Sequence, residues 1–150
     1  MKMLVTGGAG FLGKAIVQRL IAQGHEVKSL CRGHYPELEA MGVEVFRGDL
    51  ANPNIVMQAA QGCDRIYHVA AKAGVWGSYE AFYKPNVVGT ENILSACKQH
   101  GITKLIYTST PSVIHAGGDV EGIDESEPYP EYFETHYPAT KAMAEKMVLE

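Results

Sequence analysis

The chain has 150 residues, 46% of them hydrophobic and 20% charged, a composition suited to one compact domain with a single buried core. The formal net charge is -4 and the lysines and arginines form no run, so charge gives no reason to expect nucleic acid or anionic membrane as a partner. No apolar stretch is long enough to span a membrane, and the 3 cysteines lack zinc spacing, which predicts reduced thiols, no metal and a cytoplasmic protein.

Short apolar runs alternate along the chain with segments of helical periodicity, which indicates a parallel sheet wrapped by helices. Strands are expected at residues 2–5, 26–30, 43–46, 65–69 and 105–108, and helices at 10–22, 55–60, 85–100 and 138–150. Right-handed crossovers would build an α/β, Rossmann-like, doubly wound parallel sheet with helices on both faces. No repeat, low-complexity segment or linker divides the chain, so one domain is expected.

The first chemical motif is the glycine-rich turn TGGAGFLG, which follows the first expected strand and opens the first helix. Gly7, Gly10 and Gly13 lack Cβ atoms, so the chain can turn tightly and approach a pyrophosphate. Free N–H groups at the helix start, where Phe11 and Leu12 lie, would bind the phosphate charge. A glycine turn alone could be merely structural, but this strand and helix context favours an NAD(P)-binding Rossmann domain.

The end of the second expected strand bears on the choice between NADP(H) and NAD(H). An NAD site usually has an acid about 20 residues beyond the glycines, whereas this chain has Arg32 in SLCRGHY. A guanidinium suits a 2'-phosphate, so NADP(H) is preferred and NAD(H) is the alternative; a solvated surface arginine would explain the same residue. After the fourth strand, the small residues Ala70 and Ala71 would let the cofactor pass close to the backbone.

The fifth expected strand ends in LIYTSTPSV at the carboxyl edge of the sheet, where open α/β sheets bind ligands. Tyr137 and Lys141 lie four residues apart in YPATK, so they share one helical face and can address one bound cofactor. Tyr137 would be the acid/base, Lys141 would favour its ionised form and hold the nicotinamide ribose, and Thr110 would donate to the substrate oxygen. The same spacing also occurs by chance on helix surfaces; the glycine turn and the Ser/Thr-ended strand favour catalysis.

Four aromatic residues follow the fourth strand within a short stretch. Trp76, Tyr79, Phe82 and Tyr83 would form either an apolar substrate wall or the core-facing side of a short helix.

The motifs TGGAGFLG, GDL, HVAA, NVVGTENIL, YTSTPSV and YPATK run in the order of the extended short-chain dehydrogenase/reductases, which the chain resembles along its whole length. TSTPSV and YPATK resemble the 3β-hydroxysteroid dehydrogenase-like branch. AAKAGVWGSY and LIYTSTPSV resemble the 2-alkyl-3-oxoalkanoate reductases of bacterial long-chain olefin synthesis. The resemblance implies NADPH-dependent reduction of a lipid-like 2-alkyl-3-oxo acid to the 3-hydroxy acid.

The resemblance also implies roles for single residues. Asp49, with Leu50 in GDL, would lie beside the adenine ring, although a helix cap or turn acid would explain Asp49 equally well. Asn86 would support Lys141 through water, or cap a helix. Thr110 aligns with the usual catalytic serine and keeps its hydroxyl, although Ser109 and Ser112 are close enough to be confused with it.

Three alternative functions keep much of this pattern. A 3β-hydroxysteroid dehydrogenase or other lipid alcohol dehydrogenase would keep every catalytic residue, a nucleotide-sugar epimerase or dehydratase would keep the cofactor frame, and a non-catalytic NADP-binding domain would bind without turnover. The last helical pattern reaches Glu150 with no Gly or Pro stop signal. We therefore expect a longer protein whose substrate-binding part follows, residues 1–150 being inactive alone; a homodimer stays open.

Overall fold

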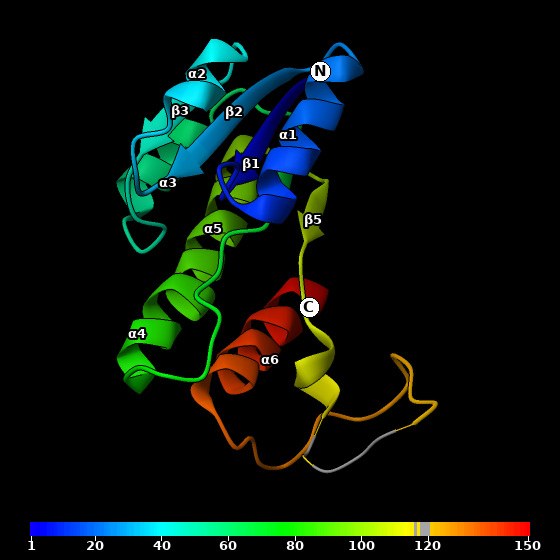
Figure 1. Cartoon of the computed structure of the whole chain (residues 1–150). Coiled ribbons are helices and arrows are strands. Elements are labelled where there is room, and N and C mark those ends of the chain that lie inside the picture. Colours follow the sequence, from blue (N-terminus) through cyan, green and yellow to red (C-terminus); the bar gives the residue numbers. More distant parts are fainter. Residues whose placement is uncertain (116, 118–120) are drawn as a thin grey trace.

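The computed structural model describes residues 1–115, 117 and 121–150, and its centre is a five-stranded parallel sheet (Figure 1). The strands are β1 (Lys2–Thr6), β2 (Glu26–Cys31), β3 (Glu44–Arg47), β4 (Arg65–His68) and β5 (Leu105–Tyr107), in the order β3-β2-β1-β4-β5. In the middle of the sheet, Leu4 of β1 pairs with Lys28 on one side and with Ile66 on the other. The strand order reverses at β1 and β4, which is where such sheets bind ligands.

Helices cover both faces of the sheet. They are α1 (Phe11–Ala22), α2 (Pro36–Ala40), α3 (Pro53–Ala60), α4 (Tyr79–Tyr83), α5 (Gly89–His100) and α6 (His136–Leu149), with a π-helical turn η1 (Lys84–Val88) and a 3-10 turn η2 (Pro111–Ile114). Neighbouring residues of β1 face opposite sides because strand side chains alternate. Leu4 packs in a core cluster with Ile93 of α5, whereas Met3 packs in a second cluster with Val17 of α1. The predicted doubly wound fold is confirmed.

The predicted strands are each right to within one residue at either end, but the helices need corrections. The segment expected as one helix at 85–100 begins as the π-helical turn η1, where Pro85 supplies no N–H for an α-helical bond. Helix α2 was not expected, because its five residues contain one buried apolar side chain, Leu38, and so carry no periodicity. Helices α3 and α6 each start two residues earlier than predicted.

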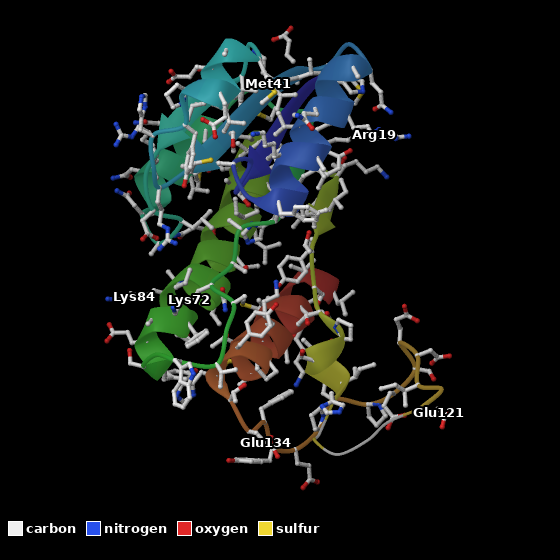
Figure 2. The ribbon with its side chains drawn as sticks, viewed as in Figure 1. Arg19, Met41, Lys72, Lys84, Glu121 and Glu134 are labelled. Atoms are coloured by element: carbon white, nitrogen blue, oxygen red, sulfur yellow. The ribbon has the colours of Figure 1, made fainter. Side chains whose placement is uncertain are left out.

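The last helix lies below the sheet in Figure 1, beside α5, and packs against α4, η1, α5 and η2. Its buried residues include Thr140, Ala142 and Ala144, whose small side chains allow a close approach. Charged side chains such as Arg19 and Glu121 extend outward from the ribbon (Figure 2). In the described part of the chain, no helix is both long enough and apolar enough to cross a membrane.

Candidate cofactor and active site

The glycine-rich segment forms a tightly packed turn between β1 and α1. Gly7 has a φ of 70°, which favours glycine, and a Cβ there would lie 3.1 Å from the Cα of Ala70. A Cβ on Gly13 would lie 2.1 Å from the carbonyl oxygen of Gly7, so any larger residue would clash. Gly10 precedes α1, and no side chain of the described residues caps this helix. Its first N–H groups are therefore available to an anion.

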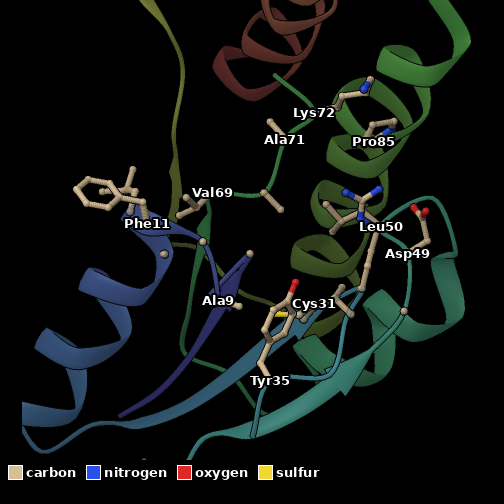
Figure 3. Close-up of a pocket in the computed structure, with 18 residues that line it drawn as sticks. Ala9, Phe11, Cys31, Tyr35, Asp49, Leu50, Val69, Ala71, Lys72 and Pro85 are labelled. Carbon is tan, nitrogen blue, oxygen red and sulfur yellow. The ribbon is translucent and has the colours of Figure 1, made fainter. Parts of the chain in front are cut away.

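A cavity of about 340 Å³ opens beside this turn (Figure 3). Ten residues predicted to bind the cofactor line it: Gly7, Gly10, Phe11, Leu12, Gly13, Arg32, Asp49, Leu50, Ala70 and Ala71. Eight further lining residues were not predicted: Ala9, Leu30, Cys31, Tyr35, Gly48, Val69, Lys72 and Pro85. Several of these lie inside the quoted motifs, so proximity to a motif was the available signal. The described residues that line this cavity do not include Tyr137 or Lys141.

Arg32 and Asp49 both border the cavity at its β2 and β3 side. Arg32 is exposed, and it forms no ion pair with a carboxylate among residues 1–115, 117 and 121–150. The Oδ1 of Asp49 accepts a hydrogen bond from the backbone N–H of Ala51 at 2.8 Å. Asp49 is therefore a turn acid and a cavity residue at once, so the two interpretations are compatible.

Lys141 lies on the buried face of α6 and is only 3% exposed. Its Nζ donates to the backbone oxygen of Thr108 at 2.6 Å and lies 4.1 Å from the ring centroid of Tyr107. Loss of hydration on burial lowers the pKa of Lys141 to about 8, an effect that Glu145 on the next turn opposes. Lys141 therefore anchors α6 to the end of β5.

Tyr137 lies one turn before Lys141 and borders a cavity of about 280 Å³. Of the described residues, the lining of this cavity includes Ser112 but not Thr110. Thr110 instead lines a cavity of about 860 Å³ between η2 and α6. As the N-cap of η2, its Oγ1 accepts from the backbone N–H of Ser112 at 3.3 Å and donates to the Ser112 Oγ at 3.2 Å. Ser112 therefore lines the same cavity as Tyr137, whereas Thr110 lines the other cavity and hydrogen-bonds to Ser112.

Glu145 was missed in the sequence, although it lies four residues after Lys141 on the same helical face. Its carboxylate accepts hydrogen bonds from the Tyr129 hydroxyl at 2.7 Å and from the Ser109 hydroxyl. The bond to Glu145 raises the pKa of Tyr129 to about 12. Burial, together with Glu145, raises the pKa of Tyr107, whose hydroxyl has no partner within the described part of the chain. Glu145 therefore ties the segment after β5 and the loop that contains Tyr129 to α6.

Asn86 lies in η1, is 2% exposed and uses its whole amide group. Its Oδ1 accepts from the backbone N–H of Lys72 at 2.8 Å, and its Nδ2 donates to the Lys72 oxygen and to the Thr140 Oγ1, both at 3.0 Å. Asn86 therefore joins the loop after β4 to α6 at the residue before Lys141. The water-mediated role of Asn86 stays a prediction.

The aromatic residues at 76–83 were expected to form either an apolar substrate wall or the core-facing side of a short helix, and they do not all behave alike. Phe82 is fully buried and belongs to the core, whereas Trp76 is 89% exposed. The rings of Tyr79 and His136 are nearly perpendicular, with centroids 5.6 Å apart. The short helix α4 therefore supports the start of α6, next to Tyr137.

The sheet order, the glycine turn with its cavity, and the helix that bears Tyr137 and Lys141 define a Rossmann-type domain of the short-chain dehydrogenase/reductase kind. The chain belongs to the 3-beta hydroxysteroid dehydrogenase/isomerase family, whose model matches residues 4–150. Cys31, Cys63 and Cys97 are free and buried. Within the described ranges, no group of three or more His, Cys, Asp or Glu residues is arranged to hold a metal.

The chain is 54% identical over 151 residues to a 2-alkyl-3-oxoalkanoate reductase of Stenotrophomonas maltophilia, covering 99% of this chain and 46% of that protein. It is 57% identical over 146 residues to a 2-alkyl-3-oxoalkanoate reductase of Shewanella oneidensis, covering 97% of this chain and 38% of that protein. A solved UDP-glucose 4-epimerase of Thermus thermophilus in complex with NAD matches with a TM-score of 0.84 and 33% identity, covering 99% of this chain and 50% of that one. The family resemblance is confirmed, and the chain spans less than half the length of these two reductases.

Proposed function

We propose that residues 1–150 are the NAD(P)-binding Rossmann domain of an NADPH-dependent oxidoreductase that reduces a 2-alkyl-3-oxoalkanoate to the 3-hydroxy acid. The observation that carries this proposal is the cavity at the glycine turn, which is lined by ten of the twelve residues predicted to bind the cofactor. Identities of 54% and 57% to two reductases of that name support the substrate class. The cytoplasmic location and the homodimer stay predictions.

The residues at this cavity fit a dinucleotide. The start of α1 offers backbone N–H groups to a pyrophosphate, and Gly7 allows close approach of the chain. The preference for NADP(H) over NAD(H) rests on Arg32, whose guanidinium would pair with a 2'-phosphate through charge-assisted hydrogen bonds. When bound, NADPH supplies the hydride for the reduction.

The chain's own residues would then handle the proton. Tyr137 donates its hydroxyl proton to the substrate carbonyl oxygen, and the nearby ammonium of Lys141 stabilises the tyrosinate left behind. A hydrogen bond to the same oxygen comes either from Thr110, once its proton turns away from Ser112, or from Ser112, which the Thr110 hydroxyl orients. Asn86 keeps α6 in place through Thr140.

The test is an assay of the full-length protein with NADPH and each of three substrates: a 2-alkyl-3-oxo acid, a 3-oxo steroid and a UDP-sugar. We expect oxidation of NADPH with the oxo acid, and a much slower reaction with NADH. Turnover of only the steroid, or only the sugar, would replace the proposed substrate. Cofactor binding without any turnover would identify a non-catalytic NADP-binding domain.

A second candidate is a 3β-hydroxysteroid dehydrogenase, favoured by the family match over residues 4–150. It would keep Tyr137 and Lys141 in the same roles and differ in the substrate. The steroid arm of the assay, run also in the oxidative direction with NAD and NADP, separates the two candidates.

A further inference from the structure

A row of five buried polar side chains connects the glycine turn with α6. Its members are Thr6, His68, Thr90, Asn86 and Thr140, and none is more than 2% exposed. A buried polar group costs free energy unless it is hydrogen-bonded, so the pairing of each member is informative. The row draws on β1, β4, η1, α5 and α6.

The hydrogen bonds on the β1 side fix the direction of the first link. The Oγ1 of Thr6 accepts from the backbone N–H groups of Val69 and Ala70, both at 3.1 Å. Both of its acceptor positions are then in use, so Thr6 donates its hydroxyl proton to the His68 Nδ1 at 2.8 Å. Nδ1 is therefore the unprotonated ring nitrogen.

The hydrogen bonds on the α5 side require the same tautomer. Thr90 donates its hydroxyl proton to the backbone oxygen of Asn86 at 2.7 Å. The Thr90 Oγ1 can then only accept from the His68 Nε2, which lies 3.0 Å away. The hydrogen bonds at both ring nitrogens of His68 therefore require a neutral imidazole protonated at Nε2.

The two ends of the row lie next to the glycine turn at the cofactor cavity and next to Tyr137, both of which the proposed reaction uses. On the cofactor side, Ala70, whose N–H is held by Thr6, contacts the position where Gly7 would carry a Cβ. On the α6 side, Asn86 donates to Thr140, which donates in turn to the backbone oxygen of His136 at 2.8 Å. The next residue is Tyr137.

The surroundings of His68 also favour the neutral ring. Burial lowers the pKa of His68 to about 3, and the ammonium of Lys141 on α6 acts in the same direction. From β5, the ring of Tyr107 lies 5.7 Å away between centroids. A protonated ring would place a second cation near Lys141 and would add an N–H at Nδ1 facing the Thr6 Oγ1, whose two acceptor positions are already in use.

We propose that His68, held as the neutral Nε2–H tautomer, is a positioning residue that links the cofactor turn to the helix bearing Tyr137 and Lys141. His68 is not among the described residues that line the cofactor cavity, so it acts through Thr6 and Thr90. The kinetic part of this inference rests on the proposed function, whereas the tautomer does not.

The kinetic test uses Thr90→Val in the full-length protein, with Thr90→Ser as the matched control. Valine keeps the shape of threonine but leaves the His68 Nε2–H without its acceptor and removes the Thr90 hydrogen bond from the Asn86 oxygen. We expect kcat to fall by about 10-fold to 100-fold, the scale of small misplacements at a reacting centre, with NADPH affinity near that of the wild type. Thr90→Ser keeps the hydroxyl and should restore kcat. A Thr90→Val protein with normal kcat, even if less heat-stable, would make the row merely structural and overturn the proposal.

The spectroscopic test uses the wild-type protein labelled with ¹⁵N-histidine and followed by NMR from pH 7 to pH 5. We expect His68 to keep a neutral ring protonated at Nε2 throughout, and this holds whether or not the oxo acid is a substrate. A ring protonated at Nδ1, or one that becomes charged above pH 5, would overturn the proposal. Absence of turnover by the wild type would count against the proposed function, and the tautomer measurement would still decide the position of the proton.

Discussion

The Nζ of Lys141 lies 2.6 Å from the backbone oxygen of Thr108, so a buried ammonium joins the last helix to the end of β5. A charge in this position is unfavourable for stability because it loses hydration, and burial is the main cause of its low pKa. The arrangement places a group proposed to take part in the chemistry where the fold alone would favour an apolar side chain.

Lys141→Met is therefore expected to lower NADPH affinity and turnover while raising stability at pH 7. Folding lowers the pKa of Lys141 from 10.5 to about 8, so between those values the unfolded chain binds more protons than the folded one. The destabilisation of the fold by the buried ammonium is greatest below pH 8, and it decreases as the pH rises toward 10.5. The variant should gain roughly 1 to 3 kcal/mol in the free energy of unfolding at pH 7, less near pH 10. Urea titrations at both pH values measure this, with the exposed Lys98→Met as control; a variant less stable at pH 7 would contradict it.

Tyr137→Phe is expected to lower kcat by roughly 10²- to 10⁴-fold in the full-length protein, the range typical of a positioned acid/base group. The change removes one hydroxyl and leaves Lys141 in place, so NADPH should still bind. Steady-state reduction of the oxo acid and a cofactor titration test both points. Tyr132→Phe, at a tyrosine that is 73% exposed, is the control. Near-normal turnover in Tyr137→Phe would exclude the proposed proton donor.

Thr110→Ser is expected to keep substantial activity, whereas Thr110→Ala should lose most of it, because the hydroxyl both caps η2 and holds Ser112. Ser112→Ala separates the two ways in which that hydroxyl could act. If Ser112→Ala is as damaging as Thr110→Ala, the serine in the tyrosine's cavity donates to the substrate. A fully active Ser112→Ala would return that role to Thr110.

Arg32→Asp is expected to weaken NADPH binding by about 1.5 to 3 kcal/mol, since a charge-assisted hydrogen bond is lost and repulsion of the phosphate is added. NADH has no 2'-phosphate, so its affinity should change far less. Fluorescence titrations with both cofactors test this. Arg19→Asp, at the other end of α1, is the matched charge change away from the cavity. Equal losses for NADPH and NADH would mean that Arg32 does not recognise the 2'-phosphate.

Gly13→Ala is expected to destabilise the fold by about 1 to 3 kcal/mol, the usual scale of overpacking, because the added methyl would meet the Gly7 oxygen. At Gly10 the same change places the nearest atom, again the Gly7 oxygen, 3.3 Å away. Gly10→Ala should therefore fold nearly as well as the wild type. Urea unfolding compares the two variants, and equal stabilities would contradict the packing described for this turn.

The sequence predicts those parts of the fold and site that depend on neighbouring residues. The strands and the glycine turn follow from local patterns, and ten of the twelve residues predicted to bind the cofactor line one cavity, but Tyr137 and Lys141 are not among its described lining residues. The engagement of Thr110 by Ser112 was not predictable, because it depends on the 3-10 turn that Pro111 begins. The His68 row was also hidden, since Thr6 and His68 are 62 residues apart and no spacing relates them. Long-range pairing of polar groups becomes visible only in three dimensions.

The central position of β1 has a consequence for how the chain reaches its fold. β1 is the first strand to be synthesised, yet one of its neighbours is β4, so that Met3 pairs with Arg65. The edge of β1 that pairs with β4 therefore stays unpaired until more than sixty residues have been synthesised. Contacts of such long sequence separation form slowly, because a large loop must close before any of them is gained. Closure of β4 onto β1, rather than formation of the nearby β1–β2 crossover, should therefore set the pace of folding.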